Sequence, residues 1–467
     1  MKRAILLSIV LAFHLFLLSC VSSPGLKDPS SLTFPPIGFE IPRAERVTLE
    51  NGIILYIIED HELPLVSVSS VIRTGSVYEP EGFEGLAGIT GALMRTGGTE
   101  GVSADEVDEA LDFIAAGLSV SVGRESGTAN LSVLKENIED GLRIFSDILM
   151  TPSFEREKLE TAKGLAIESL RRMYDNPQRF AFREFNRFLY QGDPRGRLSS
   201  EETIRGIERE DVLSFYRRFF YPENVMMAVT GDITKEEALS IISRYFGGWK
   251  SEGKTAKIAP PSLIADDSVH YIFKDIPQSV IVAGRPAPGK KSEDYYAFEL
   301  LDFIAGSGGF QSRIFSEVRN NLGLAYSAGS FYSAKTEFGI FGFYAMTGSS
   351  STGRTLTAIN DILEDIRTEG VGDDELRLAR DSLIKSFIFS FETPAEIADR
   401  QMMLEYEGLS FEFLENYRRR IEGVSKEDVE GVAKRYLSGK PSALLVLGNE
   451  EDFDRPLSDF GRVKVVK

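Results

Sequence analysis

Two stretches of this chain repeat one another at a constant offset of 217 residues. The pattern Gly206-Ile207 with Glu210-Asp211-Val212 returns as Gly423-Val424 with Glu427-Asp428-Val429. Other pairs keep the same offset: Leu159 and Leu376, Ala162 and Ala379, Ile167 and Ile384, Ser169 and Ser386, and Pro177 and Pro394. A register that stays constant over such a distance indicates an internal duplication, so the chain is expected to fold as two copies of one unit.

Each copy combines strand and helix signals. A chain of 467 residues is too long for one ordinary hydrophobic core, and its 42% apolar fraction can fill several. Asn51-Gly52 lies between two apolar runs and predicts a hairpin with a two-residue turn. Apolar strands are expected at residues 225–229 and 443–447. We therefore expect an α+β fold of two duplicated halves, each a mostly antiparallel sheet packed with helices.

Local signals place helices and boundaries along the chain. Ser103 with Glu106, and Thr234 with Glu237, are capping-box patterns that begin helices. The expected divisions are a signal peptide at 1–19, a tether at 20–40, an N-terminal half at 41–249, a linker at 250–267 and a C-terminal half at 268–467.

The first twenty residues have the pattern of an export signal. Lys2 and Arg3 precede a largely apolar run, which ends at Leu-Leu-Ser before Cys20, the only cysteine. This arrangement resembles a bacterial lipoprotein signal, which implies cleavage before Cys20 and lipid attached to it. The alternative is a plain signal peptide with an incidental cysteine. The lipoprotein interpretation implies the bacterial cell envelope, with the outer membrane facing the periplasm favoured by Val21.

Charge and histidine content exclude several kinds of site. A formal charge of −18 with no long basic run argues against binding to nucleic acid. One cysteine excludes a disulfide framework and a zinc site built on several thiolates. Once the signal is removed, His61 and His270 are the only histidines. His61 is expected in a solvated turn and His270 in a strand.

Several motifs resemble the insulinase, pitrilysin and mitochondrial processing peptidase family of zinc metallopeptidases. They are residues 75–82 (Gly-Ser-Val-Tyr-Glu-Pro-Glu-Gly), Gly85-Leu86-Ala87 and Gly97-Gly98-Thr99 in the first half. In the second half they are residues 312–315 (Ser-Arg-Ile-Phe), 317–319 (Glu-Val-Arg) and 323–326 (Gly-Leu-Ala-Tyr). The resemblance runs from about residue 41 to about residue 450 and implies the duplicated fold of that family.

The resemblance fails at the metal motif. Catalytic members carry His-x-x-Glu-His after the Gly-Leu-Ala segment, where two histidines four residues apart share one helix face and the Glu is a general base. The matching positions here are Gly88, Gly91 and Ala92. The family's third zinc ligand corresponds to Glu168, for which the alternative is an ion pair with Arg172 one helical turn away. We expect this chain to bind no zinc and no other cofactor; a zinc enzyme with relocated ligands is the less favoured option.

The second half keeps the family's Arg–Tyr pair as Arg319 and Tyr326. Ile314, Val318 and Leu322 form the expected apolar stripe of the helix that carries Arg319, and Tyr326 is expected to begin a strand. Two such donors can stabilise an oxyanion as a peptide carbonyl becomes tetrahedral. The alternative is a surface arginine beside a half-buried tyrosine.

Glycines precede this helix. Gly306, Gly308 and Gly309 resemble the glycine-rich loop with which the non-catalytic subunit of the processing peptidase helps bind substrate. The alternative is a helix entry that needs small residues.

The resemblance therefore implies a non-catalytic subunit that supplies Arg–Tyr to a zinc-bearing partner. Such a chain is expected to be inactive alone and to help hold an extended peptide, by strand addition along a sheet edge. The alternative is a structural or assembly subunit with the peptidase fold and no role in proteolysis.

Overall fold

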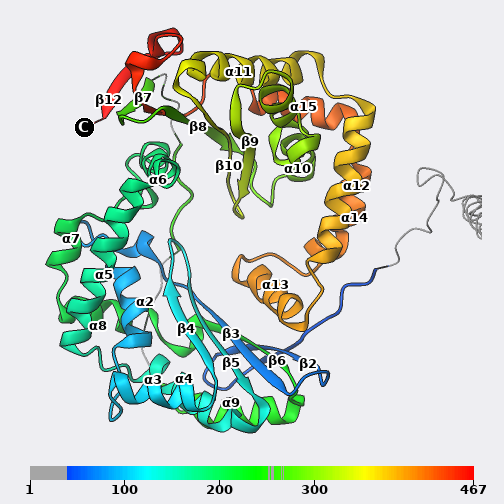
Figure 1. Cartoon of the computed structure of the whole chain (residues 1–467). Helices are drawn as coiled ribbons and strands as arrows, with labels where there is room; N and C mark the ends of the chain where they lie inside the picture. Colours follow the sequence, from blue (N-terminus) through cyan, green and yellow to red (C-terminus); the bar gives the residue numbers. More distant parts are fainter. Residues whose placement is uncertain (1–38, 251–252, 254–256, 264–265, 267, 467) are drawn as a thin grey trace, which may run out of the picture. The chain divides into compact units, whose positions relative to one another are not determined.

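The computed structural model describes residues 39–250, 253, 257–263, 266 and 268–466. The chain from Ile41 onward forms one compact unit. Cys20 and the expected signal peptide lie outside the described residues. Within the described part of the chain, the strands form two six-stranded sheets (Figure 1).

The first half of the unit contains one sheet and the helices packed on it. Its strands are β1 Glu45–Thr48, β2 Ile54–Glu59, β3 Leu65–Ile72, β4 Gly117–Val122, β5 Gly127–Leu134 and β6 Val225–Gly231. Its α-helices are α2 Leu86–Thr96, α3 Ala104–Phe113, α4 Ile138–Met150, α5 Arg156–Asp175, α6 Pro177–Leu189, α7 Glu201–Gly206, α8 Arg209–Phe219 and α9 Lys235–Phe246. Short 3-10 helices are η2 Ser76–Tyr78, η3 Lys135–Asn137, η4 Pro194–Gly196 and η5 Pro222–Asn224.

The second half contains the other sheet. Its strands are β7 Ser268–Phe273, β8 Gln278–Ala287, β9 Ala325–Ala334, β10 Gly339–Gly348, β11 Ala443–Gly448 and β12 Arg462–Val466. Its α-helices are α10 Tyr295–Asp302, α11 Thr352–Glu369, α12 Asp373–Phe389, α13 Pro394–Tyr406, α14 Glu412–Gly423 and α15 Lys426–Tyr436. Two segments are π-helical, η6 Phe303–Ser307 and η8 Phe315–Asn321. Short 3-10 helices are η7 Gly309–Gln311, η9 Ser349–Ser351, η10 Glu450–Asp452 and η11 Leu457–Asp459.

The two sheets have the same strand order except at one edge. The first is β1-β2-β6-β3-β5-β4 and the second is β12-β7-β11-β8-β10-β9. Most neighbouring pairs are antiparallel, and β2–β6, β7–β11 and β7–β12 are parallel. The expected α+β class with two mostly antiparallel sheets is confirmed, and the shared order agrees with the duplication. One edge differs, because β12 comes from the end of the chain and occupies the place that β1 has in the first sheet.

The expected hairpin is present, but its loop is longer than a two-residue turn. Thr48 pairs with Ile54, so five residues connect β1 to β2. Gly52 has a positive φ of 93°. The side-chain amide of Asn51 donates to the carbonyl of Phe246, at 2.8 Å. The side chain of Asn51 therefore connects the hairpin to the end of α9. Both expected capping boxes, Ser103–Glu106 and Thr234–Glu237, are present.

Helix α6 of the first half packs on the second sheet. It contacts β8 and β11, where Phe185 and Leu189 join a buried cluster with Val282 and Leu445. Gly284 in β8 makes room for this contact, because a Cβ there would lie 2.6 Å from Phe185 Cζ.

Helix α13 of the second half packs on the first sheet in return. It contacts β2, β3 and β6, where Ala398 and Met402 join Val71 and Ala228 (Figure 1). Pro177 begins α6 and Pro394 begins α13, so the exchanged helices are related by the 217-residue offset. The halves therefore share their cores rather than meeting only at a linker. The linker expected at 250–267 lies between α9 and β7, and only some of its residues are described.

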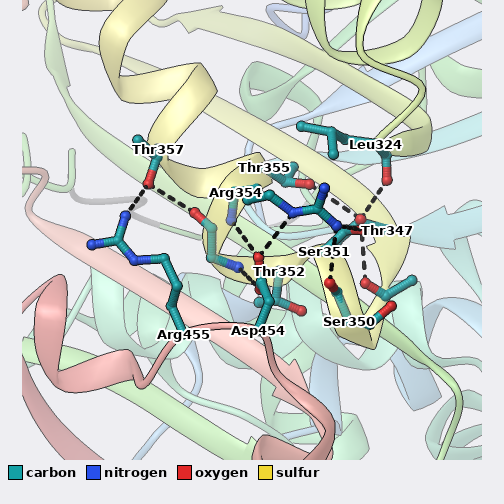
Figure 2. Close-up of polar contacts among 12 residues, drawn as sticks. Leu324, Thr347, Ser350, Ser351, Thr352, Arg354, Thr355, Thr357, Asp454 and Arg455 are labelled. Carbon is teal, nitrogen blue, oxygen red and sulfur yellow. Dashed lines mark hydrogen bonds and ion pairs between the residues drawn. The ribbon is translucent and has the colours of Figure 1, made fainter.

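A polar clamp fixes the C-terminal segment to the start of α11 (Figure 2). Asp454 accepts hydrogen bonds from the backbone N–H groups of Gly353 and Arg354, at 2.7 and 3.1 Å. The guanidinium of Arg455 donates to the hydroxyl of Thr357, at 3.0 Å. A carboxylate at a helix N-terminus is favourable because it meets unpaired N–H groups. The clamp holds the chain that leads into β12. Within the described residues, no helix is long and apolar enough to cross a membrane.

Candidate functional site

The degenerate metal motif lies on α2. The helix begins after Gly85, whose φ of 110° suits glycine. Buried Glu79 accepts hydrogen bonds from the backbone N–H groups of Gly85 and Ala87, at 3.2 and 2.8 Å. Burial raises the pKa of Glu79 to about 7. Gly88 and Ala92 both face outward from this helix and offer no metal ligand.

Gly91 lies on the buried side of α2, next to the exposed side that carries Gly88 and Ala92. A Cβ at this position would lie 2.8 Å from the backbone nitrogen of Val122 and 3.1 Å from the carbonyl carbon of Ser121. Helix α2 therefore meets β4 at backbone contact, and a glutamate side chain does not fit there without a shift of the helix or the strand. The residues present fit neither the ligands nor the general base of the zinc site that the fold family implies.

Glu168 lies on the exposed side of α5. Its side chain is 54% exposed and forms an ion pair with Arg172, the partner expected from their spacing. Exposed pairs of this kind contribute less than about 1 kcal/mol.

The two histidines lie far apart in the sheet topology. His61 is exposed after β2, with Nδ1 2.6 Å from Asp232 Oδ1, and this hydrogen bond raises the pKa of His61. His270 is buried in β7 and stacks on Phe188 with 3.8 Å between ring centroids; burial lowers the pKa of His270. Among the described residues, no group of three or more His, Cys, Asp or Glu side chains could hold a metal ion.

Arg319 and Tyr326 lie together in the second half. Arg319 is half-buried on η8, and Tyr326 is the second residue of β9 with 78% of its surface exposed. The guanidinium carbon lies 5.3 Å from the centroid of the Tyr326 ring. Across the described part of the chain, the guanidinium of Arg319 makes no hydrogen bond or ion pair, so its N–H groups remain available to a ligand.

The helix that carries Arg319 differs from the expected one. Ile314 and Val318 are fully buried, but Leu322 is 49% exposed. The N–H of Leu322 donates to the carbonyl of Glu317, five residues back, at 2.9 Å. This wider, π-type turn rotates Leu322 out of the apolar stripe that an α-helix would have made.

Two phenylalanines that were not predicted from the sequence also face Arg319. The guanidinium carbon lies 4.9 Å from the ring centroid of Phe315 and 5.9 Å from that of Phe310. The Phe310 ring is 73% exposed and packs edge-on against Phe315. Cation–π contacts of this kind hold a guanidinium without using its donors. Phe315 is four residues before Arg319, a detectable helical spacing, whereas Phe310 is brought back by η7.

A hydroxyl network holds the turn between Arg319 and Tyr326 (Figure 2). The backbone N–H of Leu324 donates to the carbonyl of Val318, at 2.9 Å. The hydroxyl of Thr347, on β10, donates to the carbonyl of Leu324, at 2.5 Å. The hydroxyl of Thr355, on α11, donates in turn to Thr347 Oγ1, at 3.1 Å. Both threonine side chains are buried. The turn is therefore held by a hydrogen bond from β10, which in turn bonds to α11.

The three expected glycines precede this segment and have different surroundings. A Cβ at Gly306 would lie 2.2 Å from the backbone nitrogen of Ser330, and one at Gly308 would lie 2.7 Å from the carbonyl oxygen of Phe303. These two glycines are required by close packing. Gly309 has a φ of 59° and open space around it.

The described residues of the C-terminal site therefore offer hydrogen-bond donors. A guanidinium and a phenol, both accessible and held at one turn, can bind a carbonyl oxygen that gains negative charge. Aromatic rings around them can pack against side chains of an extended peptide.

Two family models match the chain. Residues 55–200 match the model described as "Insulinase (Peptidase family M16)", and residues 206–383 match the model described as "Peptidase M16 inactive domain". The second match begins ahead of α8, inside the half that contains the first sheet. Together the two matches span from β2 to α12 and include both α2 and the Arg319–Tyr326 turn.

Similar proteins agree with this match. An "uncharacterized zinc protease" of Rickettsia felis is 26% identical over 350 residues, covering 74% of this chain and 84% of the relative. A solved "peptidase M16 inactive domain" from Pseudomonas fluorescens has a TM-score of 0.79 at 22% identity, covering 87% of this chain and 98% of that one. A protease from Helicobacter pylori has a TM-score of 0.78 at 19% identity, with 88% and 100% covered. A chain of complex III from Candida albicans has a TM-score of 0.72 at 16% identity, with 88% and 97% covered.

Proposed function

Since the chain belongs to the insulinase family of peptidases, family M16, we propose that it is the zinc-less subunit of a two-chain peptidase. In this role it supplies Arg319 and Tyr326 to a partner subunit that carries the zinc. Peptide hydrolysis then takes place only in the complex, and this chain is inactive alone.

The observation that carries the proposal is the unequal state of the two sites. On α2, Gly91 is in backbone contact with β4 and no metal ligand remains. On the η8–β9 turn, Arg319 has free donors and Tyr326 is exposed. A chain without any role in proteolysis has no evident use for an arginine held in this way, because an unpaired guanidinium at an aromatic surface contributes little to folding.

The contribution of this chain to the reaction is binding and electrostatic stabilisation. The Arg319 guanidinium and the Tyr326 hydroxyl donate to the carbonyl oxygen of the peptide, most strongly when that oxygen becomes negative. Phe310 and Phe315 hold the guanidinium in place, so little reorganisation is needed as charge develops. Zinc on the partner supplies the hydrolytic chemistry. The glycine at position 309 leaves space beside the turn for the peptide.

The test is reconstitution. The chain is purified alone and also co-expressed with the family member of the same genome that carries His-x-x-Glu-His. A quenched fluorescent peptide should be cleaved by the mixture and by neither chain alone. Elemental analysis should find well under one zinc per chain in this protein. Full peptidase activity of the isolated chain, or no gain of activity in a mixture that forms a stable complex, would contradict the proposal.

A second candidate is a structural subunit with no role in proteolysis. The similarity to a chain of Candida albicans complex III favours it, because a respiratory complex contains this fold. The retained Arg319–Tyr326 pair distinguishes the two functions: a structural subunit should tolerate loss of both side chains in every assay of its complex.

Anchoring at a membrane is a separate part of the proposal and rests on the sequence alone. Lipid on Cys20 would hold the complex at the bacterial cell envelope, on the periplasmic face of the outer membrane. Cys20→Ser should move the protein from the membrane fraction to the soluble fraction. Unchanged membrane attachment and identical processing of the variant would contradict lipidation.

A further inference from the structure

A surface cleft of about 670 Å³ lies between α5, the start of α6 and the loop that contains Ser199. Glu168 is one of its lining residues, so the cleft is located where the resemblance places the third zinc ligand. It lies near the start of α2 as well, because a Cβ at Gly85 would be 3.5 Å from Ser199 Cβ.

Three arginines line this cleft: Arg172, Arg179 and Arg183. Glu168 is the only carboxylate among the lining residues. The chain as a whole has a formal charge of −18, so a cleft with three guanidinium groups and one carboxylate stands out from its surroundings. A local excess of positive charge attracts anions, not metal ions.

The three guanidinium groups are in different states. The Arg183 side chain is only 13% exposed and donates to the carbonyl of Ser199 and to Glu184, so it is held in place. Arg172 is paired with Glu168 but remains 76% exposed. Arg179 is exposed, and within the described residues its guanidinium has no hydrogen bond or ion pair. The cleft therefore has one guanidinium that is fixed and compensated by Glu184, one that can exchange its partner and one that is free.

An apolar residue adjoins the arginines. Leu165, on the same helix as Glu168 and Arg172, is 63% exposed and lines the cleft. Leu165 lies three residues before Glu168 and seven before Arg172, so the three side chains share one face of α5. A ligand that fits this surface has a carboxylate next to an apolar group. Because Arg172 and Arg179 lie at the surface instead of enclosing a cavity, the cleft suits a segment of extended chain better than a small molecule.

We propose that this cleft binds a carboxylate of an extended, acidic peptide segment, whose neighbouring apolar side chain covers Leu165. The carboxylate takes the free Arg179 and displaces Glu168 from Arg172. Guanidinium groups suit this role because their planar array of donors matches the two oxygens of a carboxylate. This inference goes beyond the proposed function and needs neither a partner subunit nor catalysis.

The exchange predicts an unusual sign for one substitution. Glu168→Gln removes the competing carboxylate and frees Arg172, so it should tighten binding of an acidic peptide. If the cleft bound a cation instead, as the family's metal site does, Glu168→Gln would weaken binding of that cation. The same residue therefore separates the two chemistries.

The experiment measures binding to the purified chain by fluorescence anisotropy. The probe is a labelled peptide of alternating Leu and Glu with an amidated C-terminus, and the comparison peptide replaces each Glu with Gln. Arg179→Ala should weaken binding of the acidic peptide at least fivefold, and Glu168→Gln should tighten it at least twofold. Arg171→Ala is the matched control: it lies on α5 outside the cleft, is paired with Glu201, and should leave binding unchanged.

Three outcomes would overturn the proposal. Equal binding of the neutral peptide would show that carboxylates are not recognised. Weaker binding after Glu168→Gln would contradict the exchange with Arg172. Displacement of the acidic peptide by inorganic phosphate at a concentration as low as that of unlabelled peptide would assign the cleft to small anions instead of peptide carboxylates.

Discussion

The α2 helix and the η8–β9 turn show opposite outcomes within one family fold. On α2, Gly91 stands where the resemblance places the family's general base, and it packs closely against the backbone of β4. On the η8–β9 turn, Arg319 is surrounded by aromatic rings instead of carboxylates, and Tyr326 remains exposed. One site is closed by packing and the other is kept open.

On α2, some positions lack only a metal-binding side chain, whereas another lacks the space for any side chain. Restoring histidines at positions 88 and 92 is sterically simple, because both positions face outward. Restoring a side chain at position 91 is not, because it requires the helix to move from β4. The packing of the first half therefore opposes a side chain at position 91, whereas in the second half the guanidinium of Arg319 makes no hydrogen bond or ion pair among the described residues.

The largest effect is expected from Gly91→Glu. Its Cβ would approach the backbone of Val122 to 2.8 Å, and the charged group would enter a buried face. Overpacking together with an unpaired buried charge should lower the free energy of unfolding by about 3 kcal/mol or more. Urea denaturation measures this change.

Gly88→Ala is the matched control on the same helix. Position 88 has open space, so alanine should raise the free energy of unfolding by up to about 1 kcal/mol through helix propensity. Gly91→Ala should instead lower it by roughly 1–3 kcal/mol. Equal effects of the two alanine substitutions would show that α2 is not closed against β4.

The next largest effect concerns the open site. Arg319→Ala or Tyr326→Phe should lower kcat of the reconstituted peptidase by roughly a hundredfold, the size expected for losing one preorganised donor. KM should change less, because the interaction strengthens as negative charge develops.

Arg377→Ala serves as the control for Arg319→Ala. Arg377 is also in the second half but is 72% exposed and paired with Asp374. Its loss should leave kcat and complex formation unchanged. If Arg319→Ala and Tyr326→Phe had no more effect than Arg377→Ala, the two regions would be equally inactive, and the structural-subunit alternative would be preferred.

A smaller effect is expected from a buried carboxylate that contacts β9. Asp302 precedes η6 and accepts a hydrogen bond from the hydroxyl of Ser330, at 2.6 Å. Burial raises the pKa of Asp302 to about 6. The folded state thus binds a proton more tightly than the unfolded state, so this group stabilises the fold at low pH and loses that contribution as pH rises through 6.

Asp302→Asn should remove this pH dependence. Between pH 4 and pH 8, the wild type should lose about 2 kcal/mol more in free energy of unfolding than the variant does. Denaturation curves at several pH values provide the measurement. An identical pH profile of the two proteins would show that the pKa of Asp302 is the same in the folded and unfolded states.

The features that could be predicted from sequence are local or repeated. Ser103 and Thr234 begin helices because a capping box involves four consecutive residues. The pairing of Glu168 with Arg172 follows from one helical turn. The proximity of Arg319 and Tyr326 was expected from a family motif in which only seven residues separate them. The two-sheet fold followed from the duplication together with that resemblance.

The features that were missed depend on contacts between distant segments. Nothing in the sequence of α6 or α13 indicates that each packs on the sheet of the other half, because an apolar helix face fits either sheet. The closure of Gly91 depends on β4, about thirty residues away. The π-type turn that exposes Leu322 arises because a backbone bond to Glu317 replaces the α-helical one, and hydrophobic periodicity cannot show that choice.

The smallest expected effect tests whether the turn itself must be rigid. Thr347 reaches the carbonyl of Leu324 from β10, two residues before Tyr326, and touches no group proposed to meet substrate (Figure 2). Thr347→Val keeps the shape of the side chain but removes the hydroxyl, leaving the Leu324 carbonyl without this donor. The free energy of unfolding should fall by about 1 kcal/mol, the net value of one buried hydrogen bond.

If the bond positions Tyr326, kcat of the reconstituted peptidase should also fall severalfold while KM hardly changes. Thr347→Ser, which keeps the donor, should restore kcat. Thr357→Val is the comparison, because the hydroxyl of Thr357, on α11, bonds to Gly353 and Arg455 and not to this turn. A loss of stability with unchanged kcat in Thr347→Val would show that the threonine hydroxyls serve folding alone. The contrast with α2 would then lie in the side chains of Arg319 and Tyr326 and not in the backbone that holds them.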